Sequence, residues 1–362
     1  MGEAIERNWE IPNFTIKEIR NAVPSHCFER NTFRSFTYLI RYVFLVATTV
    51  CAALYIDSIL LSRATRLILW SVYWVAQGTI SGGLWVFAHE CGHQAFSSYK
   101  AINNGVGMVN HFFFNIPYHS WRISHSRHHK YTGLMSKDET FVPFTRSERG
   151  LPPKDANINQ QQKNDENDSR ALHYHEHEMS EQSPMRAFWS FVKVFVIGWP
   201  IYLIFGSHHH PGVNSHFNPY CALFEKRQVW DILRSDMAQF GSEIIMKLYL
   251  GPYLVLNVWI MIITYLQHTH PNVPHYRENS VDRSYGAIVD FLHHDLQRTH
   301  VAHHFFSTMP HYYTVEATHY IKKALGKSYL IEQTSIPIAL WDSWTQCRFV
   351  EDEDDVVFFK KL

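Results

Sequence analysis

The feature that most constrains this chain is a run of sequence from Leu67 to Ala88 without a single charged side chain. As an α-helix it would be about 33 Å long, enough to cross a hydrocarbon core of roughly 30 Å. The stretch from Phe36 to Ile56 has the same character, with only Arg41 near one end, where its side chain can reach the headgroups. We therefore expect a helical hairpin in a membrane. A buried helix pair in a soluble protein is the weaker alternative.

Two further apolar stretches predict a second pair of crossings. Residues 187–206 are apolar apart from Lys193, and residues 248–266 are uncharged. Together with the stretches near 36–56 and 67–88, they predict an all-α integral membrane protein with about four transmembrane helices in two hairpins. Each hairpin returns the chain to its starting side. That side carries more Lys and Arg, which predicts that it is cytosolic.

The rest of the chain is divided by composition. Residues 1–34 form a polar leader, residues 35–345 a membrane domain and residues 346–362 a tail, with leader and tail both expected in the cytosol. Residues 146–184 form a polar insert whose centre is rich in Asn, Gln, Asp and Lys. Residues 105–117 are apolar but too short to span, so we expect an interfacial or re-entrant segment.

Composition excludes several classes of function. The formal net charge is +0, which gives no electrostatic case for a nucleic-acid partner. The 5 cysteines contain no Cys-x-x-Cys pair, so neither a disulfide framework nor a zinc ribbon is expected. The first residues lack the apolar core of a signal peptide, and we expect internal segments to direct membrane insertion.

Histidines gather in three short clusters at helical spacing. The first cluster has the spacing i, i+4, and the other two repeat i, i+3, i+4, which places the rings of each cluster on one helix face. The members are His89, His93, His125, His128, His129, His300, His303 and His304. One such cluster alone would also fit a solvated basic helix face, but the predicted topology delivers all three to the same side of the membrane.

Eight imidazoles on one membrane face indicate metal binding. Neutral imidazole is a good ligand for zinc, iron, copper or nickel, but one tetrahedral zinc uses only four ligands. Two metal ions with four or five ligands each fit the number of histidines. A dinuclear, redox-active site at the membrane boundary suggests oxygen activation on a lipid-soluble substrate.

One motif supports a different class of enzyme. Residues 89–93 read His-Glu-Cys-Gly-His and satisfy the zinc protease pattern His-Glu-x-x-His, in which Glu90 would be the general base. This alternative leaves six of the eight histidines without a role. Replacing Glu90 with Gln separates the two, because a protease would lose activity while keeping its metal.

The three clusters also carry a family resemblance. His-Glu-Cys-Gly-His, His-Ser-Arg-His-His and His-Val-Ala-His-His, in this order, resemble the histidine boxes of membrane-bound fatty acid desaturases. Residues 88–97, 117–125 and 299–312 are similar to the fungal oleate (delta-12) acyl-lipid branch in particular. The resemblance implies a cytosolic helical cap that holds a histidine-rich di-iron site, with O2 as co-substrate and electrons from cytochrome b5 and its reductase.

The activity that the resemblance implies is O2-dependent insertion of a double bond into an acyl chain, most closely the conversion of phospholipid-bound oleate to linoleate. It implies a multi-pass protein of the endoplasmic reticulum membrane with a cytosolic active site, and it leaves a homo-oligomer open. An omega-3 desaturase, a hydroxylase or an acetylenase of the same fold are the nearest alternatives. The segments near 237–247 and 276–281 are shorter than in the family, so an inactive scaffold copy is also considered.

The resemblance adds two expectations about single residues and one about the tail. Family members use another metal ligand after the last span, which here points to His268, with His294 as the other candidate. His119 lies outside the second box and is expected beside the site, not in it. Residues 358–362, Phe-Phe-Lys-Lys-Leu, resemble the retrieval tails of the family.

Overall fold

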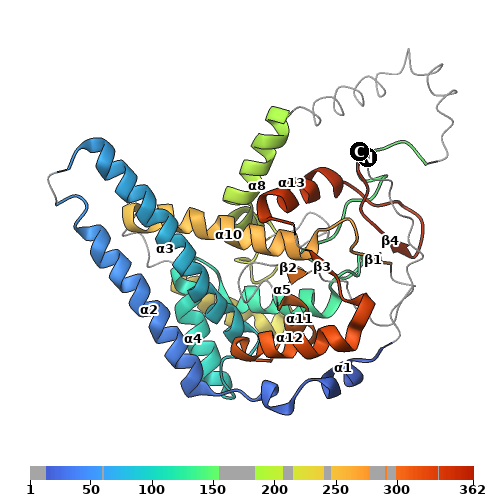
Figure 1. The fold of residues 1–362 in the computed structure, drawn as a ribbon, viewed down its shortest axis with the longest axis horizontal. Helices are drawn as coiled ribbons and strands as arrows, with labels where there is room; N and C mark the ends of the chain where they lie inside the picture. The colour runs from blue at the N-terminus through green and yellow to red at the C-terminus, as the bar shows by residue number, and fades with distance from the viewer. Residues whose placement is uncertain are drawn as a thin grey trace.

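The computed structural model describes residues 14–58, 61–154, 184–206, 215–239, 246–277, 290–291, 299–332 and 334–362, and this part of the chain is mostly helical (Figure 1). The main helices are α1 (Ile16–Ala22), α2 (Thr32–Leu54), α3 (Arg63–Gly92), α4 (Lys100–Phe113), α5 (Tyr118–Tyr131), α8 (Pro184–Phe205), α9 (Val229–Gln239), α10 (Gly251–His268), α11 (His300–Phe305), α12 (His311–Leu325) and α13 (Ile336–Gln346). Strand β1 (His275–Tyr276) pairs antiparallel with β4 (Val356–Val357), and β2 (Asp290–Phe291) pairs in parallel with β3 (Ile331–Glu332).

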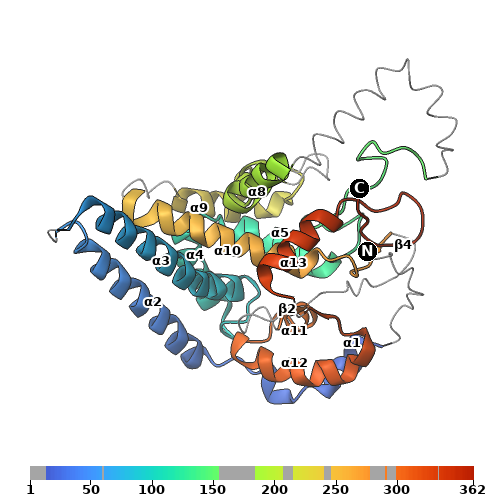
Figure 2. The ribbon, with the colours of Figure 1, turned by 45° about the horizontal axis from the view of Figure 1, so that its top comes forward.

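Helices α2 and α3 lie side by side along one edge of the molecule (Figures 1 and 2). Asn31 caps α2 by accepting a hydrogen bond from the Arg34 amide at 2.9 Å, which satisfies one free N–H of the first turn. Apolar side chains on α2 are strongly exposed, with Phe33 at 83% and Phe44 at 69%. Exposed apolar side chains in this number along one helix indicate a lipid-facing surface.

Three helices among the described residues are long and apolar enough to cross a membrane, namely Thr32–Leu54, Phe188–Phe205 and Leu248–His268. The chain is therefore a membrane protein by length and composition of these helices. Helices α2, α3, α8 and α10 lie at the four predicted spans, but α3 is not among these three. Gln77 lowers the mean hydropathy of α3. Its buried side-chain oxygen accepts a hydrogen bond from Thr49 on α2. The crossing by α3, and with it the number of four, stays a prediction.

Helices α3 and α10 pack closely because glycines remove side chains from their interface. A Cβ atom added at Gly78 would lie 2.7 Å from the carbonyl oxygen of Pro252, and one added at Gly251 would lie 2.5 Å from the Trp74 ring. Small residues allow helices to approach in this way within a membrane. The contact fixes α10, which ends at His268, against α3, which carries His89.

The segment predicted to be interfacial or re-entrant lies mainly in α4 and the turn into α5. Helix α4 packs along α3 and reaches Phe113, whose carbonyl oxygen accepts a hydrogen bond from the Tyr249 hydroxyl at 2.6 Å. Tyr249 precedes α10, which is about 27 Å long and ends at His268. Helix α4 therefore runs away from the histidines, and α5 brings the chain back to them, as a re-entrant segment would.

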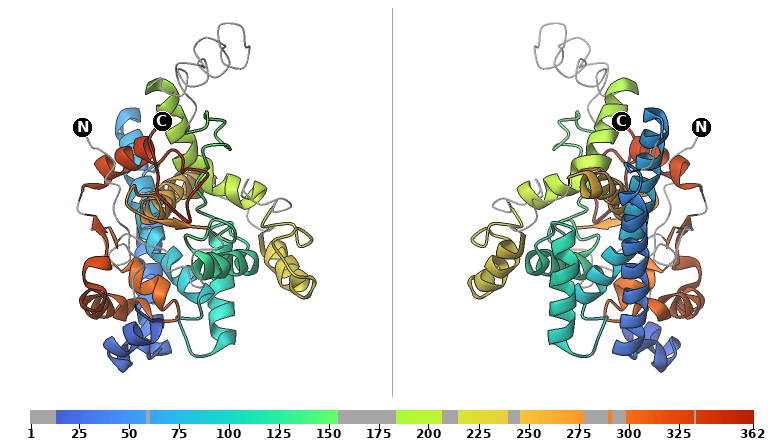
Figure 3. Two further views of the ribbon diagram at one scale, coloured as in Figure 1. Left: turned by 90° about the vertical axis from the view of Figure 1, so that its right-hand side faces the viewer. Right: turned by 90° about the vertical axis from the view of Figure 1, so that its left-hand side faces the viewer.

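The chain after α8 returns to α5. Phe195 of α8 packs on Tyr265 of α10, with ring centroids 5.6 Å apart, and the His216 ring then lies 3.1 Å from the Ser124 hydroxyl on α5. Figure 3 shows α9, in yellow, outside α4 and α5. The two-hairpin topology expects residues 207–247 on the face opposite the histidines, yet the described residues 215–239 begin beside the helix that carries His125. A full crossing by α8 therefore stays a prediction.

The C-terminal residues, predicted as a cytosolic tail from residue 346, pack against residues 144–149 and 275–277, and their cytosolic location stays a prediction. The buried carboxylate of Glu351 accepts hydrogen bonds from Arg146 at 2.6 and 3.0 Å and from Lys360 at 2.9 Å. These contacts lower the pKa of Glu351 to about 2, chiefly through Arg146. Phe359 packs against the His275 ring. Arg146, the first residue of the predicted polar insert 146–184, is part of this packing. Residues 155–183 lie outside the described residues, so the insert stays a prediction.

Candidate metal centre

Four helices converge where the three histidine clusters meet. The end of α3 supplies the first cluster, α5 the second, α11 the third, and the last residue of α10 adds His268. Helices α5 and α11 lie next to each other in Figure 1, although about 170 residues of chain separate them. The local spacing forms each cluster, and the packing of the helices joins them.

Five of the histidines form one group. One ring nitrogen from each of these five histidines lies within 4.8 Å of the others, and the members are His89, His93, His125, His129 and His303. The shortest approaches are 2.8 Å between the Nε2 atoms of His89 and His125, and 3.1 Å between those of His125 and His129. We call this set the five-histidine group.

Four histidines form a second group beside it. His128, His268 and His304 offer ring nitrogens within 4.8 Å of one another. The His268 Nε2 atom lies 3.3 Å from that of His128 and 3.1 Å from that of His300, which adds the fourth member. We call this set the four-histidine group. The two groups together contain all eight histidines of the predicted boxes and His268, while His294 lies outside the described residues.

The protonation of these rings fits cation binding. Burial, followed by the charge of neighbouring histidines, lowers the pKa of His303 to about 3 and the pKa values of His93, His125, His129 and His304 well below the ordinary value. The rings are therefore neutral at pH 7, and each neutral ring has one nitrogen without a proton. Neutral imidazole is the form that binds metals.

The hydrogen-bond pattern supports the same conclusion. Nε2 atoms of two histidines face each other in four pairs. Only one proton fits between the two atoms of a pair, so at least one nitrogen in each pair is an unprotonated electron-pair donor. Further buried ring nitrogens, including His93 Nε2, His303 Nε2 and His304 Nε2, have no hydrogen-bond partner. Buried polar atoms rarely stay unpaired. Cations placed between these nitrogens would satisfy them, and the number and type of donors fit two imidazole-binding ions.

Asp138 supports the four-histidine group, although no sequence pattern pointed to it. Its Oδ1 atom accepts a hydrogen bond from His128 Nδ1 at 2.9 Å and from the Thr140 amide at 3.0 Å, and the residue is 1% exposed. Burial by itself raises the pKa of Asp138, but His128 and the amide donors lower it overall. The carboxylate thus keeps the proton of His128 on Nδ1 and leaves Nε2 free to face His268. No spacing rule marks an Asp in the turn after a helix.

Replacing Asp138 with Ala is expected to weaken metal binding by about 10- to 100-fold, because the acceptor that orients His128, a candidate metal ligand, is lost. Competition with a chelator on purified protein measures this affinity. Asp355→Ala is the matched control, since Asp355 is exposed on the C-terminal segment. Equal affinities in the two variants would contradict the role of Asp138.

Two other residues of the sequence hypotheses lie outside both groups. Glu90 turns away from them and binds the start of α12, where the His311 amide donates to its Oε2 atom at 3.0 Å. A zinc protease needs this carboxylate at the metal, so the geometry opposes that hypothesis. His119 is buried beside Tyr118, as expected for a neighbour of the site that is not a ligand.

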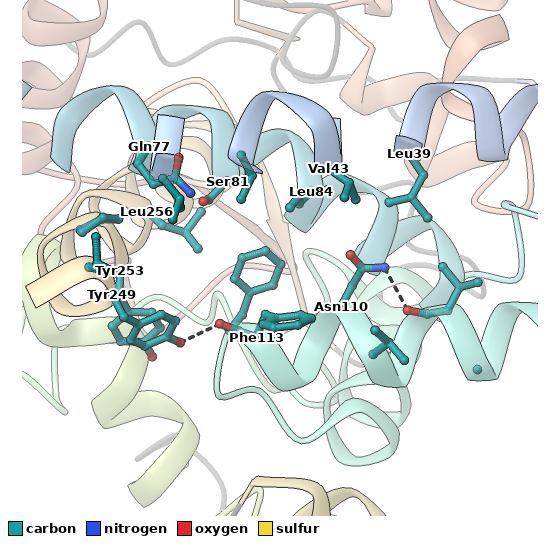
Figure 4. A pocket seen from close by; sticks show the side chains of 18 residues that line it. Leu39, Val43, Gln77, Ser81, Leu84, Asn110, Phe113, Tyr249, Tyr253 and Leu256 are labelled. Carbon is teal, nitrogen blue, oxygen red and sulfur yellow. Dashed lines mark hydrogen bonds between the residues drawn. The ribbon is translucent and has the colours of Figure 1, made fainter. Parts of the chain in front are cut away.

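An apolar cavity of about 540 Å³ lies between α2, α3, α4 and the start of α10 (Figure 4). Its walls extend from Leu39 to Tyr249 and Tyr253, and Leu84 and Ser81 of α3 line it. Leu84 precedes His89 by five residues, about 7.5 Å along the helix axis. The few polar side chains in its lining are those of Gln77, Ser81, Asn110 and the two tyrosines. Such a cavity suits a hydrocarbon chain.

Comparison with known proteins places this arrangement in a family. The model of the fatty acid desaturase family matches residues 67–335, which include every histidine of both groups. The chain belongs to the fatty acid desaturase family. Family membership makes it an oxidoreductase of lipid metabolism, and the family resemblance seen in the three boxes is confirmed.

Similar proteins cover almost the whole chain. The delta(12) fatty acid desaturases of Mortierella isabellina and Mortierella alpina are each 43% identical to it, over 99% of this chain and 93% of each relative. The omega-6 fatty acid desaturase, endoplasmic reticulum isozyme 1, of Glycine max is 36% identical over 95% of this chain and 88% of its own length.

Proposed function

We propose that this desaturase converts oleate to linoleate in membrane lipids, with two irons held by the nine histidines. The observation that carries the proposal is the convergence of nine histidines in two groups beside an apolar cavity. The names of the Mortierella relatives support delta-12 regiochemistry. We further propose that electrons come from cytochrome b5 and its reductase.

The bound irons would supply the O2-dependent removal of two hydrogens from adjacent acyl carbons, with O2 and two electrons and two protons giving two water molecules. The residues of the chain do the rest. Buried imidazoles stay neutral and available as ligands, Asp138 orients His128, and the cavity holds the acyl chain away from water. A fixed chain position selects which carbons approach the site.

The location of the protein is part of the proposal. The exposed apolar helices and the name of the Glycine max relative support a location in the endoplasmic reticulum membrane. We propose that the histidines lie on its cytosolic side. Four crossings in two hairpins remain our proposal for the topology. Lys360 of the proposed retrieval tail donates a hydrogen bond to Glu351. Recognition of residues 358–362 as a retrieval signal would therefore require this contact to break. A homo-oligomer is compatible with this arrangement.

Expression in a host that makes oleate but no linoleate tests the proposed reaction. Fatty-acid profiling is expected to show linoleate as the new product. A trienoic acid formed only when linoleate is supplied would indicate an omega-3 desaturase, whereas a hydroxylated or acetylenic acid would indicate a hydroxylase or an acetylenase. No new acyl product from stable protein with cytochrome b5 present would favour an inactive scaffold copy.

Filling the cavity is expected to reduce turnover without unfolding the protein. Ser81 lines the cavity and is small, so Ser81→Leu would occupy space needed by the acyl chain and lower the linoleate yield about tenfold. Ser71→Leu is the matched control, because Ser71 is exposed on the same helix. Fatty-acid profiles of cells with equal protein levels measure the effect. Equal linoleate yields in the two variants would contradict the proposal that the acyl chain binds in this cavity.

A further inference from the structure

Glu90 is a buried carboxylate that no metal role accounts for. It lies on α3 between His89 and His93 and is 2% exposed. Its Oε2 atom accepts the hydrogen bond from the His311 amide at 3.0 Å and lies 3.6 Å from His311 Nδ1. An unpaired carboxylate is costly to bury, so this contact with a residue 221 positions away is what stabilises it there.

The partner of Glu90 is the first residue of α12. Pro310 precedes this helix and provides no side-chain cap, so the helix does not cap the His311 amide from its own N-cap residue. A carboxylate at this position both accepts a hydrogen bond and interacts favourably with the helix dipole. Glu90 therefore caps α12 from a different helix.

The corner that Glu90 holds leads directly to the third histidine cluster. Only residues 306–310 separate α11 from α12. In the same corner the His311 ring packs on Phe87 of α3 and on Tyr38 of α2, at centroid distances of 5.2 and 5.3 Å. Across the corner, the ring of His303 lies 4.6 Å from that of His89. Movement of the α11–α12 corner would pull these rings apart.

We propose that Glu90 is a positioning residue that couples the first histidine cluster to the third by capping α12. The proposal rests on the proposed di-iron function for its consequence, which is correct placement of His303 in the five-histidine group. It assigns Glu90 no part in proton transfer. The negative charge of Glu90 interacts favourably with the dipole of α12, and its hydrogen bond satisfies the first amide of that helix.

The backbone donor can be removed without removing the helix. Proline is well tolerated as the first residue of a helix and has no N–H, and Pro310 already has φ -66 and ψ 141, which a following proline permits. His311→Pro thus deletes the donor, and Glu90→Ala deletes the acceptor. His311→Ala keeps the N–H and removes only the ring. Glu90→Gln keeps an acceptor oxygen and removes only the charge.

Iron retention on purified protein, measured by competition with a chelator, is the first readout. We expect Glu90→Ala and His311→Pro each to weaken it about tenfold, and the double variant to be no worse than either, because both changes remove one interaction. His311→Ala and Glu90→Gln are expected to stay within about threefold of wild type, since the hydrogen bond remains. Glu316→Gln on α12, in an exposed pair with His26, is the control for loss of a carboxylate.

Hydrogen exchange of the metal-free protein is the second readout. Faster exchange at the start of α12 in Glu90→Ala and His311→Pro, but not in His311→Ala, supports the cap. Unchanged exchange and unchanged iron retention in both variants would overturn the proposal, as would additive losses in the double variant.

Wild-type protein without iron would instead refute the proposed function, and the exchange experiment would still decide the role of Glu90. Inactive Glu90→Gln with full metal and unchanged exchange would assign Glu90 to chemistry and also overturn the proposal.

Discussion

Replacing His128 with Ala is expected to abolish linoleate formation, to below about one hundredth of wild type. His128 connects the site in three ways, because its Nδ1 binds Asp138, its Nε2 faces His268 and its ring packs edge-on against His304. Its removal takes one of the four proposed ligands from the four-histidine group and leaves the buried Asp138 carboxylate without its main partner. Fatty-acid profiling beside measured protein levels gives the result.

Two other histidines serve as controls for this variant. His319 is exposed on α12, so His319→Ala is expected to keep wild-type activity. His209→Ala is expected to do the same, although His209 lies outside the described residues. Activity that survives His128→Ala, or that is lost in all three variants, would show that the site is misassigned.

Purified wild-type protein is expected to contain about two irons per chain, because one tetrahedral ion cannot use nine imidazoles arranged in two groups. His268→Ala is expected to lower the content towards one iron, since His268 Nε2 approaches both His128 and His300 in the four-histidine group. Elemental analysis after removal of loosely bound metal measures both values. His270→Ala, two residues further on, is the matched control.

The metal content also separates the classes of enzyme. A single zinc per chain, unchanged in His268→Ala, would contradict the di-iron proposal and favour the zinc protease hypothesis. Removal of iron with a ferrous chelator is expected to stop turnover, and iron alone, not zinc, is expected to restore it, because zinc has no redox chemistry.

Much of the site followed from local patterns. The uncharged run before His89 predicts a helix, and a helix fixes the relative directions of His89 and His93 because its turn contains 3.6 residues. The same periodicity holds for His125, His128 and His129 on α5. These features depend on neighbouring residues alone, so they could be predicted without knowledge of the packing.

Other features depend on residues that are distant in the chain. The choice between His268 and His294 was open in the sequence, and the structure places His268 in contact with His128 and His300 because α10 packs along α3 through Gly78. Hydropathy predicts the chain after α8 on the other face of the membrane, because an apolar helix of this length is expected to cross fully. Contact between His216 and Ser124 could not be foreseen from hydropathy.

Periodicity and hydropathy are local properties, so the order of residues was enough to show that this chain is helical, that it enters a membrane and that eight histidines line helix faces. How those faces meet depends on the packing of helices that are distant in the chain. This packing divides nine histidines into two groups and places Glu90, a candidate base in the sequence, at the start of α12. The hydrogen bond of the buried Glu90 carboxylate joins two helices that are distant in the chain, so no sequence spacing could predict its partner.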